Sequence, residues 1–330
     1  MILIDLVYIN SHGGIVLAKE ILSRISASEN NSKYVLLVDS RNKKHFSLYG
    51  FQTYTINKSE IERIRFYWSK KYNKILCFGN VPPPFNCAKE IYIYFHNILL
   101  LDTFQSNISL MGKIKFWLKR SYIKIINRNY YWFVQNKEMK QKLNKQISVS
   151  NSKIFIAPIF SARKILFDKK ESNSFIYPTS ESSHKNNLIL IKSFIKAAEE
   201  LSVELSEILT IKGDDFTNLK IPKNLKIDFI GGIKRDKLLS LYSNTKFLIF
   251  PSLKESFGLP LIEGIQAGCY IIVSNLNYAK EIIDASIYFD PNSVESIKNS
   301  IVKCISGSDL NPSRILVNNS IEFIYNKCLN

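Results

Sequence analysis

Residues 250–275 read FPSLKESFGLPLIEGIQAGCYIIVSN, and an apolar strand gives way to a helix within them. The strand ends in a polar loop that carries Glu255, and Pro260 then stands at the expected first position of the helix. The first amides of a helix have no partner within it and carry the positive end of its dipole, so they suit a phosphate group. Gly258 lets the backbone approach such a group closely. We therefore expect an anion-binding turn, with Glu255 just before the helix and Glu263 about one turn inside it.

Short β-rich runs alternate with amphipathic stretches on both sides of residue 165. This alternation is typical of parallel strands joined by crossover helices. A chain of 330 residues suits two domains of about 150 residues each, so we expect two doubly wound α/β domains. Such sheets bind ligands beyond the carboxyl ends of their strands, which predicts a site in a cleft between the domains. Strands are expected at residues 2–9, 34–38, 75–78, 91–95, 131–134, 175–178, 208–212, 227–230, 247–250 and 270–273, and first-half helices at residues 15–26, 61–71, 113–127 and 137–143.

The composition is that of a folded globular chain, with 46% apolar and 22% charged residues. The five cysteines are scattered and include no C-x-x-C pair, which argues against a disulfide framework or a zinc site and fits a reducing cytoplasm. The apolar N-terminus lacks a basic leader, and no window approaches about 18 uninterrupted apolar residues. We therefore expect a cytoplasmic protein whose membrane contact, if any, is peripheral.

The positive charge is confined to the first half of the chain. Residues 1–165 contain 26 Lys and Arg against 9 Asp and Glu, whereas residues 166–330 contain 19 of each, so the first half holds the whole net charge of +17. A basic half joined to a neutral one suggests that the first half faces a lipid headgroup layer, a phosphorylated acceptor or nucleic acid. Chance bias in a lysine-rich protein is the alternative.

On spacing alone, Glu255 and Glu263 could equally be ordinary carboxylates that complement the helix dipole. The wider sequence favours a site, because E-S-F-G-L-P-L-I-E closely resembles the E-x7-E motif of family-4 retaining glycosyltransferases. The resemblance covers most of the second half and scattered points of the first. It is carried by Tyr177-Pro178, His184-Lys185-Asn186, Leu188 to Ala197, Ile211 to Gly213, Phe229 to Gly231, Phe250 to Ser252, Gly264 to Gly268, Ile271 to Asn275, Glu281 and Ile287 to Pro291, and by Gly13-Gly14, residues 92–97, Val134-Gln135 and Met139-Lys140.

The resemblance implies a GT-B fold, in which two Rossmann-like doubly wound domains face one another across a cleft. Residues 1–165 would be the acceptor-binding domain and residues 166–311 the nucleotide-sugar-binding domain. Residues 312–330 would form a final helix that crosses back toward the first domain.

The resemblance also implies roles for single residues. Glu255 would contact hydroxyls of the transferred sugar, Glu263 would accept hydrogen bonds from the ribose, and Lys185 would neutralise the diphosphate and stabilise the leaving group. The other donor-binding residues implied are Ser256, Phe257, Gly258, Leu259, Gly213 and Gly14.

One position departs from the family's pattern. The family often has an arginine shortly before the lysine, where this chain has Thr179, so half of the usual phosphate clamp is missing. His184 and Lys254 are candidates to compensate. Outside this context, Lys185 would be interpreted as a solvated loop lysine.

Two features of the first half match the family's pattern as well. Gly13 and Gly14 follow a strand and precede an amphipathic helix, so they leave room for a phosphate or an acceptor, although such a pair often just forms the turn. His96 ends an apolar strand, where the family places a histidine that approaches the sugar. A lone histidine is more often structural, but the matching position leads us to group His96 with Glu255 and Lys185 as catalytic.

Residues 113–128 read KIKFWLKRSYIKIINR and predict a basic amphipathic helix. At helical spacing, a row of cations within about 80° lies beside a separate apolar stripe. The row contains Lys113, Arg120, Lys124 and Arg128, and the stripe contains Ile114, Leu118, Tyr122 and Ile125. Such a helix suits an anionic membrane surface, and a domain helix with its stripe in the core fits the pattern about equally. The charge excess leads us to prefer the membrane, with a lipid-diphosphate-linked glycan as acceptor at its inner face.

We therefore predict a retaining transfer of a hexose-type sugar from UDP or GDP to a growing glycan, in the synthesis of O-antigen, lipopolysaccharide or capsule. The implied mechanism is front-side attack, in which the departing phosphate helps to remove the acceptor's proton. No cofactor and no metal ion is expected, because the GDD sequence at Asp214-Asp215 does not match the D-x-D pattern of metal-dependent transferases.

Two other interpretations share some of these features. A GT-B nucleotide-sugar epimerase or phosphorylase has the same architecture, and the E-x7-E match disfavours it. A non-enzymatic nucleic-acid-binding protein is suggested by the basic first half and the aromatic content of 12%. No nucleic-acid-binding module is recognisable, so no nucleic-acid partner is expected.

Overall fold

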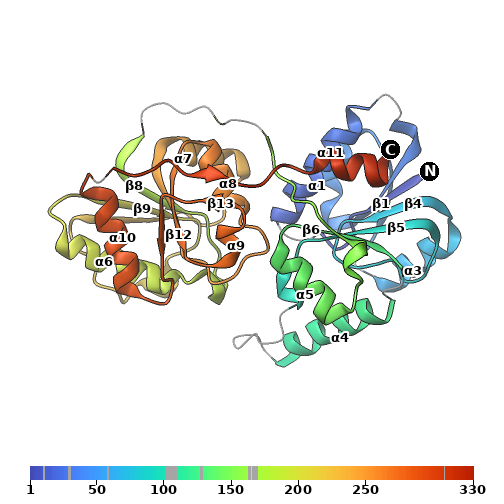
Figure 1. The fold of residues 1–330 in the computed structure, drawn as a ribbon, viewed down its shortest axis with the longest axis horizontal. Coiled ribbons are helices and arrows are strands. Elements are labelled where there is room, and N and C mark those ends of the chain that lie inside the picture. The colour runs from blue at the N-terminus through green and yellow to red at the C-terminus, as the bar shows by residue number, and fades with distance from the viewer. Residues whose placement is uncertain are drawn as a thin grey trace. The chain divides into compact units, whose positions relative to one another are not determined.

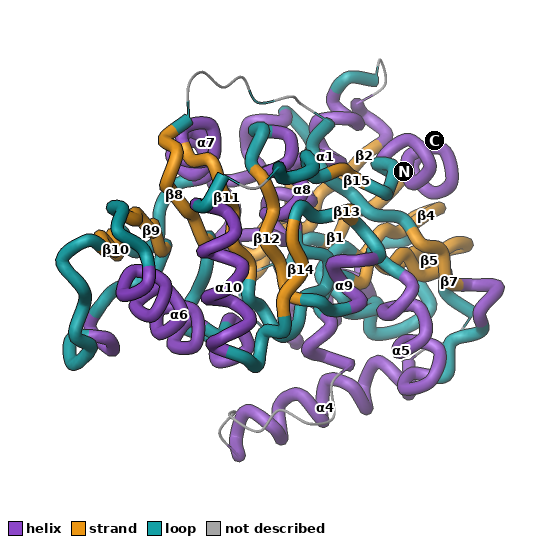
Figure 2. Tube along the Cα trace, turned by 60° about the vertical axis from the view of Figure 1, so that its left-hand side comes forward, coloured by secondary structure: helices purple, strands orange, loops and turns teal. Residues whose placement is uncertain are grey.

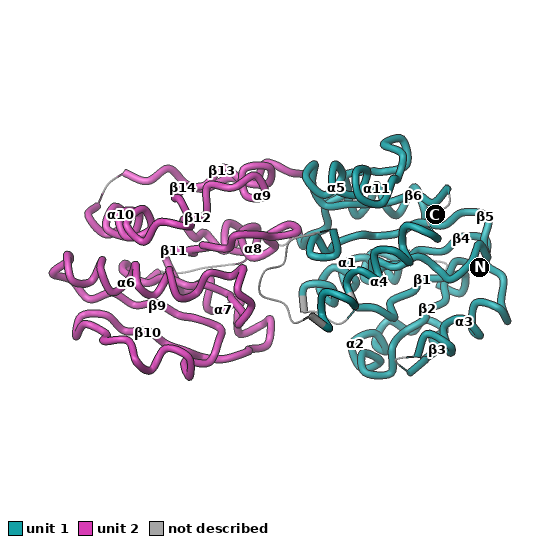
Figure 3. The backbone as a smooth tube through the Cα atoms, turned by 90° about the horizontal axis from the view of Figure 1, so that it is seen from below, with its two compact units in different colours: residues 1–161, 318–330 teal, residues 162–317 magenta. Residues whose placement is uncertain are grey.

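The computed structural model describes residues 1–9, 12–28, 31–57, 59–101, 110–126, 129–162, 165, 170–307 and 309–330. They form two compact units (Figure 3): unit 1 comprises residues 1–161 and 318–330, and unit 2 comprises residues 162–317. The chain leaves unit 1 after residue 161 and returns after residue 317, whereas the sequence placed these boundaries after residues 165 and 311.

Unit 1 is built on a parallel sheet with helices on both faces (Figure 1). Its strands are β1 (Ile2–Asp5), β2 (Tyr34–Asp39), β3 (Gln52–Ile56), β4 (Tyr72–Cys77), β5 (Ala88–Phe95), β6 (Tyr131–Val134) and β7 (Ile154–Ile156). Its longer helices are α1 (His12–Ser26), α3 (Glu60–Ser69), α4 (Leu110–Ile126) and α5 (Lys137–Ile147). The seven strands lie in the order β3-β2-β1-β4-β5-β6-β7, which is a doubly wound arrangement.

Both faces of this sheet are apolar, because helices cover each of them. Ile2 and Ile4 of β1 belong to the same core cluster as Ile21 of α1, whereas Leu3 belongs to the opposite cluster with Phe66 of α3. The alternation of side chains along each strand therefore supplies two cores, one on each face.

The C-terminal residues complete unit 1. Helix α11 (Ile321–Ile324) continues into a π-helical turn over Tyr325–Leu329. Ile324 and Leu329 join the core cluster that contains α1, and Tyr34 Oη donates a 2.8 Å hydrogen bond to the Leu329 carbonyl.

The single helix predicted over residues 312–330 is wrong in extent. Arg314–Ile315 forms β15, which pairs antiparallel with β13 (Ile283–Asp284) in unit 2. The helix starts only at Ile321. Just before it, the Ser320 amide donates a 2.8 Å hydrogen bond to the Pro158 carbonyl.

Unit 2 contains a second parallel sheet, with six strands in the order β10-β9-β8-β11-β12-β14. These strands are β8 (Glu171–Tyr177), β9 (Leu205–Leu209), β10 (Leu225–Phe229), β11 (Thr245–Phe250), β12 (Tyr270–Ser274) and β14 (Ile287–Phe289). The helices are α6 (Asn187–Glu200), α7 (Arg235–Asn244), α8 (Leu259–Gln266), α9 (Asn277–Lys280) and α10 (Val294–Ile305). Helices α6 and α10 lie side by side (Figure 2), and α7 contacts α8.

The predicted pair of α/β domains is confirmed, with differences in single strands. The sequence did not predict β3, β7 or β14, and it placed β9 at residues 208–212 instead of Leu205–Leu209. The strand was predicted to start at Ile208 because a mostly apolar run begins there. The observed strand instead includes Glu207, a residue type that is uncommon in strands.

Glu207 lies in the middle of β9 and is 0% exposed. Neither of its carboxylate oxygens has a hydrogen-bond partner among the residues that the structure describes. Burial raises the pKa of this carboxyl well above its ordinary value of 4.5, because an unpartnered charge is costly in an apolar interior. The folded unit therefore favours the protonated form.

We predict that Glu207→Leu increases the free energy of unfolding by about 1–3 kcal/mol at neutral pH, because it removes an unsatisfied polar group from the core. The folded state holds its proton to a higher pH than the unfolded state, so Glu207 lowers stability progressively as pH rises above 4.5. Urea denaturation should show a larger gain at pH 8 than at pH 5. Glu204→Gln, at an exposed position nearby, should change little, and a Glu207→Leu variant less stable than the parent at both pH values would contradict the prediction.

Candidate functional site

The predicted turn before α8 is present in unit 2. Strand β11 ends at Phe250, and α8 begins at Leu259 with Gly258 as its N-cap in a left-handed conformation (φ 83°) that favours glycine. Gly264 lets α8 lie against the sheet, since a Cβ there would be 2.7 Å from Leu248 Cδ1. The N-cap residue, Gly258, has no side chain with which to cap the first turn of α8. This helix start therefore offers the electropositive end that an anion prefers.

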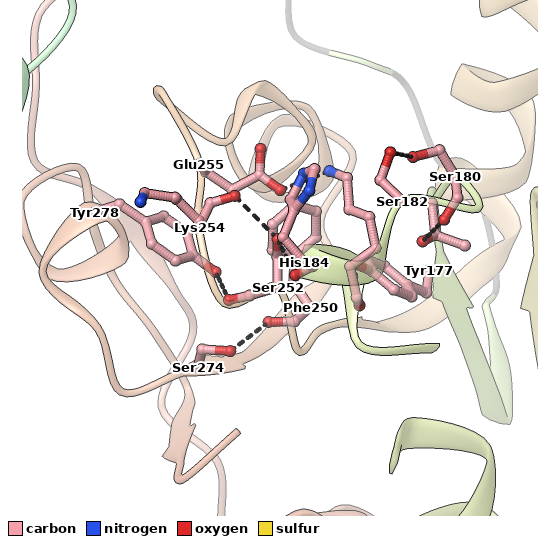
Figure 4. A network of polar contacts seen from close by, with 12 residues as sticks. Tyr177, Ser180, Ser182, His184, Phe250, Ser252, Lys254, Glu255, Ser274 and Tyr278 are labelled. Carbon is pink, nitrogen blue, oxygen red and sulfur yellow. Dashed lines mark hydrogen bonds and ion pairs between the residues drawn. The ribbon is translucent and has the colours of Figure 1, made fainter. Parts of the chain in front are cut away.

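Glu255, in the loop before α8, forms an ion pair with Lys185. Lys185 Nζ lies 2.5 Å from Glu255 Oε1, and the two side chains are only 16% and 15% exposed, respectively. Figure 4 shows Glu255 and His184 close together near the end of β11. Lys185 follows β8, the neighbour of β11 in the sheet, so parallel pairing brings together two predicted site residues that are distant in sequence.

The loop that carries Lys185 is fixed by hydrogen bonds. Tyr177 Oη donates to the Lys185 carbonyl at 2.8 Å. Asn186 adopts a left-handed conformation (φ 62°), and its Nδ2 donates to the carbonyls of Pro291 (2.6 Å) and Pro251 (3.4 Å). These bonds join the loop after β8 to the segments that follow β11 and β14, and they thereby position the Lys185 ammonium.

Glu263 forms a second ion pair, with a partner that the sequence did not single out. Arg235 Nη2 donates a 3.0 Å hydrogen bond to Glu263 Oε1, and the Glu263 side chain is only 7% exposed. Arg235 is the first residue of α7, which packs against α8. The sequence offered only weak evidence for Arg235 as a site residue. It stands in a basic run, I-K-R-D-K over 233–237, and the sequence does not indicate which of these side chains faces α8.

The position where the related family often has an arginine is structural in this chain. The Thr179 amide donates to Thr210 Oγ1 at 2.7 Å, and the Thr179 hydroxyl donates to Asn187 Oδ1 at 2.7 Å. Thr179 therefore connects the ends of β8 and β9 to the start of α6.

His184 and Lys254, the predicted substitutes for that arginine, both have pKa values below their ordinary values. Burial lowers the pKa of His184, and the nearby Lys185 charge lowers it further. Burial also lowers the pKa of Lys254. Arg235 is a further cation, and it contacts the predicted donor residue Glu263.

The other predicted donor residues of unit 2 lie at the same edge of the sheet. Ser256 and Phe257 continue the loop toward Gly258, and the Phe257 side chain is buried. Gly213 lies beyond the end of β9, where a Cβ would be 2.9 Å from the ring of Phe229 on β10, so a larger residue would displace that ring. Since all six strands run parallel, their carboxyl ends gather these residues on one side.

His96 directly follows β5 in unit 1. Its amide donates a 2.6 Å hydrogen bond to Asn80 Oδ1, and its ring lies 5.8 Å from Phe78 and 6.0 Å from Tyr94, between centroids. Burial lowers the pKa of His96 to about 4. The imidazole is therefore neutral at neutral pH and can both donate and accept a hydrogen bond.

Gly13 and Gly14 lie in the first turn of α1, which begins at His12, and not in a turn before the helix. The strand predicted over residues 2–9 is also too long, because β1 ends at Asp5. A Cβ at Gly13 would meet no described atom within 4 Å. Packing within unit 1 therefore does not require glycine at position 13.

Helix α4 exposes an apolar stripe to solvent. Its exposed apolar residues are Met111, Ile114, Trp117, Leu118 and Ile125. Trp117 is 62% exposed and Ile125 is 79% exposed, whereas Ile123 on the opposite side is buried in the core of unit 1. The alternative in which this stripe packs into the core is therefore wrong for most of its residues.

The cations predicted beside this stripe differ in their surroundings. Lys113 and Lys124 are exposed. Arg120 Nε donates a 3.0 Å hydrogen bond to the Leu100 carbonyl, and burial lowers its pKa, while Arg128 lies outside the described residues. In the part of the chain that the structure describes, no helix has both the length and the hydropathy needed to span a bilayer.

The family model described as Glycosyl transferases group 1 matches residues 160–322. O-antigen chain mannosyltransferase RfbU of Salmonella typhimurium is 26% identical over 171 residues, which are 49% of this chain and 47% of that protein. O-antigen chain mannosyltransferase B of Escherichia coli is 31% identical over 80 residues, which are 24% of this chain and 21% of that protein. The matched part of the chain thus spans about half of the first relative and a fifth of the second.

The structure is also similar to solved structures. That of Anabaena Alr3699/HepE, determined in complex with UDP and glucose, gives a TM-score of 0.67 at 12% identity and covers 93% of this chain and 90% of that chain. At this identity the likeness shows the fold alone. With the two parallel sheets described above, it confirms the predicted GT-B class.

Asn186 provides a test of how the Lys185 loop is held. We predict that Asn186→Ala lowers the free energy of unfolding by about 2–4 kcal/mol, because alanine is strained at positive φ and the amide hydrogen bonds are lost. Asn186→Gly should cost about 1–3 kcal/mol, since only the hydrogen bonds are lost. Chemical denaturation measures both effects, with the exposed Asn218→Ala as a control. Equal stability of Asn186→Ala and the parent chain would contradict the assignment.

Proposed function

Because residues 160–322 match the family model described as Glycosyl transferases group 1, we propose that the chain transfers a sugar from a nucleotide diphosphate sugar to a glycan acceptor. The observation that supports this most directly is the start of α8. The ion-paired carboxylate of Glu255 lies just before this helix, and the ion-paired carboxylate of Glu263 lies within it. A diphosphate suits the amides and the nearby cations, and sugar hydroxyls suit the carboxylates.

In the proposed complex, Lys185 pairs with the diphosphate and Glu255 accepts hydrogen bonds from the transferred sugar. A largely buried ammonium needs an anionic partner, and Glu255 supplies one. The diphosphate replaces Glu255 as the partner of Lys185, which releases the carboxylate to the sugar hydroxyls. Glu263 accepts hydrogen bonds from the ribose.

We further propose that transfer retains the configuration at the anomeric carbon and needs no metal ion. The bond from that carbon to the phosphate oxygen breaks, and the acceptor oxygen bonds to the same face. The acceptor's proton passes to the departing phosphate. Lys185 and the amides of Gly258 and Leu259 stabilise the negative charge that develops on the leaving group. His96, which the resemblance groups with the catalytic residues, would act as a neutral imidazole.

The relatives support a role in surface polysaccharide synthesis. Both are named as O-antigen chain mannosyltransferases, so we propose a hexose donor carried by UDP or GDP. We propose a growing, lipid-linked glycan as the acceptor.

Titration with UDP and GDP tests the donor site. We predict that Lys185→Ala weakens the affinity for the preferred diphosphate about ten- to a hundredfold, the effect of losing a charge-assisted hydrogen bond. Glu255→Gln should not weaken it, because Glu255 competes with the phosphate for Lys185. The same variant should transfer sugar much more slowly, since the contact with the sugar hydroxyls is weakened.

Isothermal titration calorimetry gives the affinities, and release of nucleoside diphosphate from the nucleotide sugar gives the rate. Lys192→Ala removes an exposed lysine from α6 and is the matched control. Absence of binding to either diphosphate by the parent chain would refute the proposed function.

We also propose that α4 contacts an anionic membrane surface, where a lipid-linked acceptor would be found. Its apolar stripe is exposed and flanked by Lys113 and Lys124, and the first half of the chain carries the whole positive charge excess. An exposed tryptophan beside lysines is suited to the boundary between headgroups and acyl chains. On this proposal, the protein acts at the cytoplasmic face of the membrane.

Vesicle sedimentation tests this surface. We predict binding to vesicles that contain phosphatidylglycerol and little binding to pure phosphatidylcholine, because each lysine contributes about 1 kcal/mol near an anionic surface. Lys113→Ala with Lys124→Ala, or Trp117→Ser with Leu118→Ser, should lower partitioning about tenfold or more. Trp68→Ser changes a tryptophan on α3 that is even more exposed than Trp117 and should have no effect. Equal partitioning of all variants would exclude α4 as the contact.

A further inference from the structure

Arg235 connects α7 to the carboxylate of α8 that the proposed function assigns to the ribose. Its Nη2 donates to Glu263 Oε1 at 3.0 Å. The Arg235 side chain is partly exposed and the Glu263 side chain is nearly buried. The guanidinium therefore reaches from the surface of α7 to a carboxylate that has little access to water.

Burial makes this contact important for Glu263. A carboxylate removed from water needs hydrogen-bond donors, preferably cationic ones, to remain ionised and fixed in orientation. A planar guanidinium sets the orientation of a carboxylate more closely than a lysine ammonium does. A carboxylate can accept about four hydrogen bonds, so its bond to Arg235 is compatible with binding of ribose hydroxyls.

The surroundings of the Arg235–Glu263 pair are apolar enough to strengthen the interaction between the two charges. Tyr242 lies two turns beyond Arg235 on α7 and is completely buried. Burial raises the pKa of its hydroxyl well above 10, and the Glu263 charge raises it further while Arg235 opposes that rise. The charges of Arg235 and Glu263 thus act across a poorly solvated region.

We infer that Arg235 is the positioning residue for Glu263, holding its carboxylate in the orientation that binds the ribose of the sugar donor. This inference rests on the proposed function and adds a residue to it. Arg235 acts through Glu263 and is not assigned a contact with the reacting atoms. Thr179, which occupies the usual arginine position, forms hydrogen bonds with Thr210 and Asn187. Arg235 is a separate cation, contributed by a different segment.

The test compares ribonucleotides with nucleotides that lack the ribose hydroxyls. UDP, GDP and their 2′,3′-dideoxy forms are titrated into the full chain and into Arg235→Ala, Arg235→Lys and Lys237→Ala. Lys237 is an exposed lysine on the same helix and matches the charge change. Thermal unfolding of each variant shows whether it is folded.

We expect the parent chain to bind the ribonucleotide about ten- to a hundredfold more tightly than its dideoxy form, as hydrogen bonds to a charged group predict. Arg235→Ala should lose about tenfold in ribonucleotide affinity and leave dideoxynucleotide affinity within about twofold. Arg235→Lys should be intermediate, because it retains the charge but not the planar guanidinium. Lys237→Ala should behave as the parent chain.

A double variant separates positioning from a general effect on stability. If Arg235 acts through Glu263, Arg235→Ala combined with Glu263→Gln should bind ribonucleotide no more weakly than Glu263→Gln alone. Additive losses would overturn the inference, and so would an unchanged preference for ribose in a folded Arg235→Ala variant. In both of these cases the parent chain still binds nucleotide and the proposed function stands. Failure of the parent chain to bind any of the four nucleotides would refute both the inference about Arg235 and the proposed function.

Discussion

The edge of unit 2 at the start of α8 depends on the pairing of charges that are removed from water. A buried carboxylate without a partner costs several kcal/mol, and Glu255 and Glu263 lie where Lys185 and Arg235 reach them. The two pairs connect loops and helices that follow three different strands, β8, β10 and β11, so the site is as much a product of sheet topology as of local sequence. A ligand that displaces one partner must supply comparable charge or hydrogen bonds, which favours anionic and polyhydroxylated molecules.

Unit 1 uses the same kind of pairing to stabilise its fold. At the end of β1, Asp5 accepts hydrogen bonds from Arg63 Nη2 (2.8 Å), Tyr67 Oη (2.6 Å) and the Val7 amide (3.0 Å), with both charged side chains about 1% exposed. Both carboxylate oxygens of Asp5 therefore accept hydrogen bonds from α3 or from the backbone. Glu207 shows the opposite case, in which a carboxyl is buried among described residues that offer no hydrogen bond.

Features that depend on neighbouring residues could be predicted from the sequence, and features that depend on packing could not. The turn at Gly258 and the loop at Lys185 were recognisable because their residue types and spacing are local. Arg235 was not, because its partner is 28 positions away and the contact exists only once α7 lies against α8. The helix α4 was predicted correctly, but its pattern is the same whether the apolar stripe faces the core or solvent. The roles assigned to Glu255, Glu263, Lys185 and His96 stay predictions until ligands are measured.

The discontinuity of unit 1 has a consequence for biosynthesis. Residues 318–330 contribute Ile324 and Leu329 to the core beside α1, yet they emerge from the ribosome only after all of unit 2. While unit 2 is translated, the first 161 residues therefore lack the residues that cover part of the α1 face. Unit 2 can already fold in this interval. During this interval the nascent chain exposes an apolar surface that the finished domain covers.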